Sequence, residues 1–176
     1  MRRLGIITAL SLLVLAVSAS VAVAAITTTF NPANAPTGTH LQSGTIGCTV
    51  DSSLLVTCST FELAGVGGAN ATGALATTYS ATVDCTNNGG KLVPVKSTAQ
   101  TTPTTTGSLS PKNGRLSVPA LNSGPVPTAG DFEAAATCPN GNWTKSLAGG
   151  SITLSSFTYT LTFAGFSGAY ITITGP

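Results

Sequence analysis

Alternation of apolar and polar residues constrains the fold of this chain more than any other feature. In TTYSATVDCT, residues 77–86, Tyr79, Ala81, Val83 and Cys85 share one parity, while polar residues fill the other. Successive side chains of a strand point to opposite faces of a sheet. The pattern therefore predicts a strand with one buried face and one solvated face.

The same period returns near the C-terminus, with one interruption. The apolar positions are first even and then odd: Ile152 and Leu154, followed by Phe157, Tyr159, Leu161 and Phe163. One extra residue in a β-bulge at Ser155–Ser156 would shift the phase in this way. Residues 165–168 then predict a turn, and residues 170–174 predict a last short strand.

A third segment, DFEAAAT at residues 131–137, carries two conflicting signals. Its Glu-Ala-Ala-Ala favours a helix by intrinsic propensity. However, Phe132, Ala134, Ala136 and Cys138 again share one parity, and the segment is short. We interpret it as a strand with these four side chains facing inward.

These segments together predict an all-β fold. The chain after residue 24 has no long amphipathic helical pattern, and glycine, proline and asparagine turns separate many short apolar runs. Such a pattern is typical of an antiparallel β-sandwich, immunoglobulin-like in its general architecture. Residues 25–176 are enough for a single domain. The Thr- and Pro-rich residues 97–112 are either an edge strand with its loop or a glycosylated linker, and we favour the edge strand.

Two of the four cysteines, Cys48 and Cys58, lie close together in CTVDSSLLVTC. If they face each other across a hairpin, Val50 faces Val56 on the same side and residues 51–55 form the turn. Facing strand residues are close enough for a disulfide. Cys85 and Cys138, each at the end of an alternating segment, are then left for a second disulfide. We predict these two among the three pairings that four cysteines permit.

The N-terminus predicts secretion. Arg2 and Arg3 precede an uncharged apolar run, and small residues ending in Ala22-Val23-Ala24 follow it, as in a signal peptide of residues 1–24. Without these two arginines the seven Lys and Arg of the chain become five, which balance the five Asp and Glu. No basic patch is left for nucleic acid. We expect a protein released from the cell, with disulfides formed in an oxidising space.

Several stretches resemble a family of small secreted actinobacterial proteins of unknown function. The matching pieces are CTV…LLVTCSTFELAGVGGANAT, YSATVDCTNNGG and ATCPNGNW, which cover the cysteines and roughly half of the mature chain. The resemblance implies secretion, a β-rich domain and the same disulfide pairs. It implies no activity, no cofactor and no catalytic residue.

Residues for catalysis are scarce, and we predict that the protein is not an enzyme and has no catalytic residue, metal or cofactor. His40 is the single histidine, and no serine lies in a G-x-S-x-G motif. Asp131 and Glu133 are the only carboxylates close in sequence within an expected strand, where they would share its solvent face. Asp84, Asn87 and Asn88 offer oxygen ligands for calcium, but an Asn-Asn-Gly-Gly turn explains the asparagines equally well.

Trp143 follows Cys138 closely, and two roles are open to it. It could pack in the core over the second disulfide, which we favour, or serve as an exposed platform for a sugar ring together with Tyr79, Tyr159 or Tyr170. The first function hypothesis is therefore a secreted, non-enzymatic sandwich that contacts proteins of the cell envelope or the medium. The second is a carbohydrate- or cell-wall-binding module. The third and weakest is a membrane-inserting hairpin at residues 155–163, so a membrane partner is not expected.

Overall fold

The computed structural model describes residues 25–101 and 103–176, and the predicted signal peptide lies outside them. The fold is all-β and antiparallel, as predicted, and this part of the chain forms three sheets. The largest has seven strands: β1 (Thr27–Phe30), β6 (Ala71–Thr86), β7 (Leu92–Gln100), β8 (Thr104–Thr105), β11 (Thr144–Leu147), β12 (Thr153–Phe163) and β13 (Ala169–Gly175).

Two smaller sheets have three strands each. The first is formed by β3 (Cys48–Val50), β4 (Val56–Cys58) and β10 (Leu121–Asn122). The second is formed by β2 (His40–Gly44), β5 (Phe61–Ala64) and β9 (Arg115–Val118). Within the described residues, the helical elements are a short 3-10 helix, η1 (Pro32–Asn34), and one α-helix, α1 (Ala129–Ala135).

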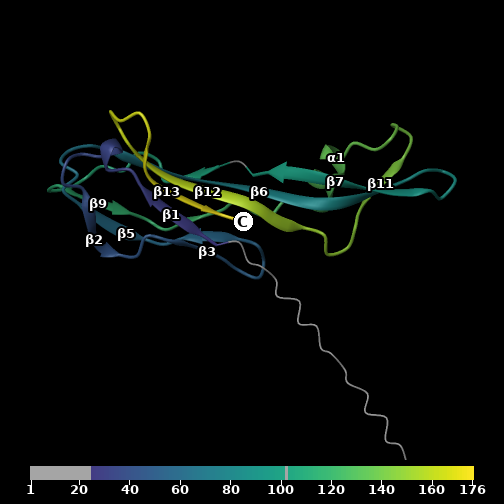
Figure 1. Cartoon of the computed structure of the whole chain (residues 1–176), viewed down its shortest axis with the longest axis horizontal. Coiled ribbons are helices and arrows are strands. Elements are labelled where there is room, and N and C mark those ends of the chain that lie inside the picture. The colour runs from purple at the N-terminus through teal and green to yellow at the C-terminus, as the bar shows by residue number, and fades with distance from the viewer. Residues whose placement is uncertain (1–24, 102) are drawn as a thin grey trace, which may run out of the picture.

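The long strand β6 organises the large sheet. On one side it pairs with β12 and then β11, and on the other with β8 and then β7. β13 and β1 follow β12 outward to the edge. Figure 1 shows β6 and β12 running along the molecule, with β2, β5 and β9 near one end and α1, β7 and β11 near the other. The predicted alternation of residues 77–86 is confirmed, because every odd residue of β6 is buried.

One face of the large sheet carries the whole apolar core. The main cluster joins inward residues of β6, β12 and β13 to both small sheets, which makes this part of the molecule a sandwich: Leu75, Phe157, Tyr159, Leu161, Phe163, Ile171 and Ile173 against Val56, Phe61, Leu63, Leu116 and Val118. A second cluster covers the other half of β6 with α1: Tyr79, Ala81, Val83, Phe132 and Ala136. The opposite face of the sheet takes no part in either cluster.

The bulge and both disulfides are confirmed. The register of β12 against β6 shifts between Leu154 and Ser156, so the extra residue lies where the phase of the sequence pattern changes. Cys48 faces Cys58 and Val50 faces Val56 across the β3–β4 hairpin. The bonds are Cys48–Cys58 and Cys85–Cys138. Two disulfides are typical of proteins that fold in an oxidising compartment.

The Thr- and Pro-rich stretch belongs to the sheet, as favoured. Residues 97–100 complete the edge strand β7, and β8 adds a short pairing to β6 farther along. Beyond it, Leu109 forms a bridge with Ala71, which returns the chain to the start of β6. The described part of this stretch is therefore an edge strand with its loop and not a linker.

The prediction of a strand at residues 131–137 is wrong, since Ala129–Ala135 form α1. A capping box closes the N-terminus of the helix: the Asp131 carboxylate accepts hydrogen bonds from the Thr128 backbone N–H at 2.7 Å and from the Thr128 hydroxyl at 2.8 Å. Phe132 and Ala136 are buried, but Ala134 is exposed. Residues four apart in the sequence lie on one face of a helix and also share a parity. Phe132 and Ala136, two of the four expected inward residues, are therefore compatible with either structure.

Candidate functional site

The described carboxylates mostly serve local structure. The Asp51 carboxylate closes the hairpin turn by accepting from the N–H groups of Ser53 and Leu55, and Glu62 pairs with Arg115 at 3.0 Å. Hydrogen bonds from Thr128 lower the pKa of Asp131. The carboxylate therefore remains ionised, and keeps capping the helix, at lower pH than an ordinary aspartate would.

The expected surface pair of Asp131 and Glu133 is not formed on a strand. Both residues belong to α1, and Glu133 Oε1 accepts a hydrogen bond from the Leu147 N–H at 2.9 Å. His40 lies exposed in β2, with its Nδ1 2.8 Å from the Gly38 carbonyl oxygen. The hydrogen bonds of these acids and of His40 thus support turns, the helix cap and contacts between elements. The described structure brings none of the acids to the histidine as a hydrogen-bonded pair.

The oxygen-rich turn after β6 is explained by its own hydrogen bonds. Asn87 Oδ1 accepts from the N–H groups of Gly89 at 3.0 Å and Lys91 at 2.8 Å. Across residues 25–101 and 103–176, no group of three or more His, Cys, Asp or Glu side chains is placed to hold a metal ion. In the same residues, no helix is long and apolar enough to cross a membrane.

The three tyrosines do not form an exposed aromatic platform. Tyr79, Tyr159 and Tyr170 are 0%, 1% and 6% exposed. Their rings belong to the core, which corrects their assignment as ligand contacts. Trp143 is half-buried and lies in neither apolar cluster, so the favoured role of core packing is not supported either. The aromatic residues of the suggested membrane hairpin, such as Phe157 and Phe163, are likewise buried.

The buried hydroxyls of Tyr159 and Tyr79 have different surroundings. Tyr159 Oη has no hydrogen-bond partner among the described residues, and burial raises its pKa to about 12. It lies near Gly73, where an added Cβ would come within 3.3 Å of it. Tyr79 Oη instead donates a hydrogen bond to the Leu54 carbonyl oxygen at 3.0 Å. This bond ties the turn of the β3–β4 hairpin to the centre of β6.

This difference predicts that removal of the two hydroxyls affects stability differently. Tyr159→Phe is expected to leave the free energy of unfolding unchanged or to raise it by about 1 kcal/mol, because a buried, unpaired hydroxyl is lost. Tyr79→Phe should lower it by about 1 kcal/mol and leave the Leu54 carbonyl unpaired. Urea unfolding of both variants measures the two values. A larger loss for Tyr159→Phe than for Tyr79→Phe would contradict this arrangement.

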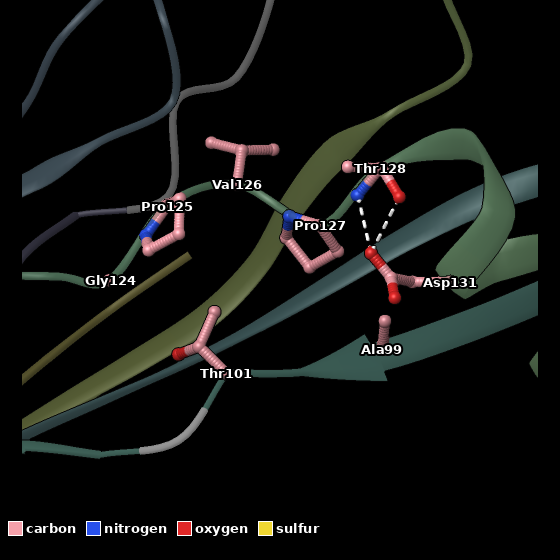
Figure 2. A pocket seen from close by; sticks show the side chains of 8 residues that line it. All are labelled: Ala99, Thr101, Gly124, Pro125, Val126, Pro127, Thr128 and Asp131. Carbon is pink, nitrogen blue, oxygen red and sulfur yellow. Dashed lines mark hydrogen bonds between the residues drawn. The ribbon is translucent and has the colours of Figure 1, made fainter.

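A cavity of about 360 Å³ lies between the end of β7 and the segment that leads into α1 (Figure 2). Its walls include Pro125, Val126 and Pro127, and its polar side chains make hydrogen bonds within the fold. Asp131 is bonded to Thr128, and the Thr101 hydroxyl lies 2.6 Å from that of Thr77. The cavity therefore presents few free polar groups that could orient a ligand.

The face of the large sheet that takes no part in either apolar cluster carries a regular array of side chains. Neighbouring strands place threonines side by side along this face. We name it the threonine face and define it by ten residues: Thr27 and Thr29 of β1, Thr172 and Thr174 of β13, Thr158, Thr160 and Thr162 of β12, and Thr72, Ala74 and Ala76 of β6.

The strand register arranges these residues in rows. Thr27, Thr174, Thr158 and Ala76 follow one another across β1, β13, β12 and β6. A second row, two residues away along each strand, contains Thr29, Thr172, Thr160 and Ala74. A third, shorter row pairs Thr162 with Thr72. The inward neighbours of these residues fill the main core cluster, so packing on the other side holds the rows in place.

The threonine face is uncharged and its hydroxyl groups are largely free. β1, β12 and β13 contain no Asp, Glu, Lys or Arg, and the single charged residue of β6 is Asp84, far along that strand. All ten residues are exposed or half-exposed. Thr29 Oγ1 donates to the Thr172 carbonyl oxygen at 3.3 Å. No hydrogen bond of the other threonine hydroxyls of this face occurs within the described part of the chain.

The sequence carries a signal for this surface in its T-x-T repeats. The alternation of residues 77–86 alone predicts only a solvated face. The T-x-T repeats in TTTF, TYTLT and ITIT were not connected, because only the register of the strands places them side by side. Comparison of the chain with protein-family models, with curated proteins and with solved structures found no match.

Proposed function

We propose that the mature chain is a secreted, non-enzymatic binding protein that attaches through its threonine face to an extended, uncharged surface. The single observation that carries the proposal is the ordered array of free hydroxyl and methyl groups on a sheet face that the rest of the fold leaves uncovered. The signal-peptide pattern and the two disulfides support secretion.

The side chains of this face favour an extended surface over a folded protein partner. Cores of protein interfaces are enriched in aromatic residues, methionine and arginine, and all of these are absent from the ten residues of the threonine face. A partner held by ion pairs would need charges that the face lacks. The remaining fit is to a neutral surface that offers many weak hydrogen bonds and apolar contacts at once.

The proposal is tested with solid probes and matched variants. The purified mature protein is mixed with microcrystalline cellulose, with crystalline chitin and with growing ice, and the bound fraction is measured for each. Thr158→Lys places an ammonium group on the threonine face. Thr57→Lys makes the same change at an exposed strand position of β4, in one of the small sheets.

We expect the wild type to bind at least one of the three solids and Thr57→Lys to match it. Covering an unpaired ammonium with a neutral surface is unfavourable, so Thr158→Lys should bind at least roughly tenfold more weakly. Trp143→Ala tests the second function hypothesis in the same assay. Loss of binding in Trp143→Ala but not in Thr158→Lys would replace the threonine face by a site at Trp143. Absence of wild-type binding to all three solids would reject the proposal.

A further inference from the structure

The residue types that the threonine face lacks restrict which partners it can bind. Sugar rings are commonly held by stacking on exposed aromatic side chains, but Tyr159 points inward from the same strand that carries Thr158 and Thr160. The face is neutral, so the partner that complements it is neutral as well. Threonine is β-branched and stiff at χ1, and its hydroxyl and methyl groups are therefore largely fixed before any contact is made.

The rows of the threonine face are regularly spaced. Adjacent strands lie about 4.8 Å apart, and residues two positions apart along a strand are separated by about 6.7 Å. The face thus repeats one chemical group along two nearly perpendicular directions. On the prism planes of hexagonal ice, water oxygens also repeat along two perpendicular directions, at spacings close to these two. A hydroxyl array of this kind can take the place of surface water molecules while its methyl groups fill the spaces between them.

We propose that the surface recognised by the threonine face is ice. This inference rests on the proposed function, because it names the solid to which the face attaches. The contact would be made mainly by β12 and β13, which contribute Thr158, Thr160, Thr172 and Thr174 from the middle of the array. Thr27 and Thr29 of β1 extend the array on one side, and Ala74 and Ala76 of β6 on the other.

The twist of the sheet limits how strongly the threonine face can bind ice. Neighbouring strands rotate by roughly 20° relative to each other, so a planar lattice can follow the array closely over only two or three strands. We therefore expect the protein to slow the regrowth of ice grains at moderate concentration and to shape growing crystals. A large depression of the freezing point is not expected.

The experiment measures ice recrystallisation in thin frozen films. The mature protein with both disulfides intact is compared with Thr158→Lys, Thr57→Lys and Thr160→Val. Thr160→Val keeps the shape of the side chain and removes one hydroxyl. Thermal unfolding of each variant verifies that it is folded. Bovine serum albumin at equal mass is the control for nonspecific effects of protein in the film.

The wild type and Thr57→Lys should keep grains small at the same concentration. Thr158→Lys should need at least roughly tenfold more protein for the same grain size, and Thr160→Val should need an intermediate amount. Grain growth in the wild-type film equal to that with albumin would overturn the inference. If the wild type then still bound cellulose or chitin through Thr158, the proposed function would stand without ice. Equal activity of Thr158→Lys and the wild type would overturn the assignment to this face.

Discussion

Loss of the Cys85–Cys138 disulfide is expected to lower the thermal stability more than loss of Cys48–Cys58. The two bonds join residues 53 and 10 positions apart in the sequence. In the chain-entropy model the longer loop contributes roughly 4 kcal/mol and the shorter one roughly 3 kcal/mol. The hairpin has further support, because facing valines and the Tyr79 bond to Leu54 hold its strands and turn.

The longer bond has a second structural effect. It connects the end of β6 to the segment after α1. The helix α1 covers the smaller of the two apolar clusters. Without the bond, α1 keeps its contacts through Phe132 and Ala136 but loses its covalent anchor. Reduction of the bond should therefore loosen the cluster around Tyr79 and Val83 before it affects the sandwich of the main core.

Thermal unfolding of Cys85→Ala/Cys138→Ala and Cys48→Ala/Cys58→Ala compares the two bonds directly. A difference of 1 kcal/mol corresponds to about 2–4 °C in a domain of this size, so we expect the first double variant to melt several degrees lower. The reduced wild type serves as a control that lacks both bonds. Equal midpoints, or a lower midpoint for the hairpin variant, would show that the second cluster contributes less than we infer.

Phe132→Ala is expected to have the largest effect of any single substitution in α1. The ring is fully buried among Tyr79, Ala81 and Val83, and no other side chain within α1 is buried. Removing such a side chain costs about 3–5 kcal/mol through lost burial and the cavity that remains. The Phe132 carbonyl oxygen also accepts a buried hydrogen bond from the Ser97 hydroxyl at 2.8 Å, and a shifted helix would lose this bond.

Ala134→Asp is the matched control for the helix. Ala134 is exposed in α1, so the new carboxylate lies in solvent and should change stability by less than about 0.5 kcal/mol. In the strand that the alternation predicted, the same carboxylate would point into the core and destabilise the fold severely. Denaturant unfolding of both variants separates the two structures. A severe loss of stability in Ala134→Asp would favour a strand over the helix at this position.

The β-sandwich and its covalent frame were predictable because local pattern and global structure agree. The parity of Cys48 and Cys58 fixes the hairpin register. The change of phase at Ser155–Ser156 marks the extra residue of a β-bulge. The helix was not predictable in this way. Phe132 and Ala136 satisfy both periods, and the decisive signal was the Thr128–Asp131 cap, which has the spacing of a helix start.

The candidate site was missed for a different reason. Exposed aromatic residues are common binding elements, which makes Trp143 and the tyrosines candidates from sequence alone. Their exposure, however, depends on tertiary packing that one sequence does not reveal. The threonine face needs the pairing of β1 with β13, which are more than 130 residues apart in the chain. Sequence spacing within one strand says nothing about such a neighbour. The array exists only once the sheet is assembled.

Selective uptake into growing ice tests the central claim most directly. An equimolar mixture of the wild type and Thr158→Lys is cooled slowly, and mass spectrometry gives the ratio of the two proteins in the ice and in the remaining liquid. We predict that the wild type is enriched in the ice, whereas a mixture of the wild type and Thr57→Lys keeps its original ratio. Equal distribution of the wild type and Thr158→Lys between ice and liquid would contradict binding through the threonine face.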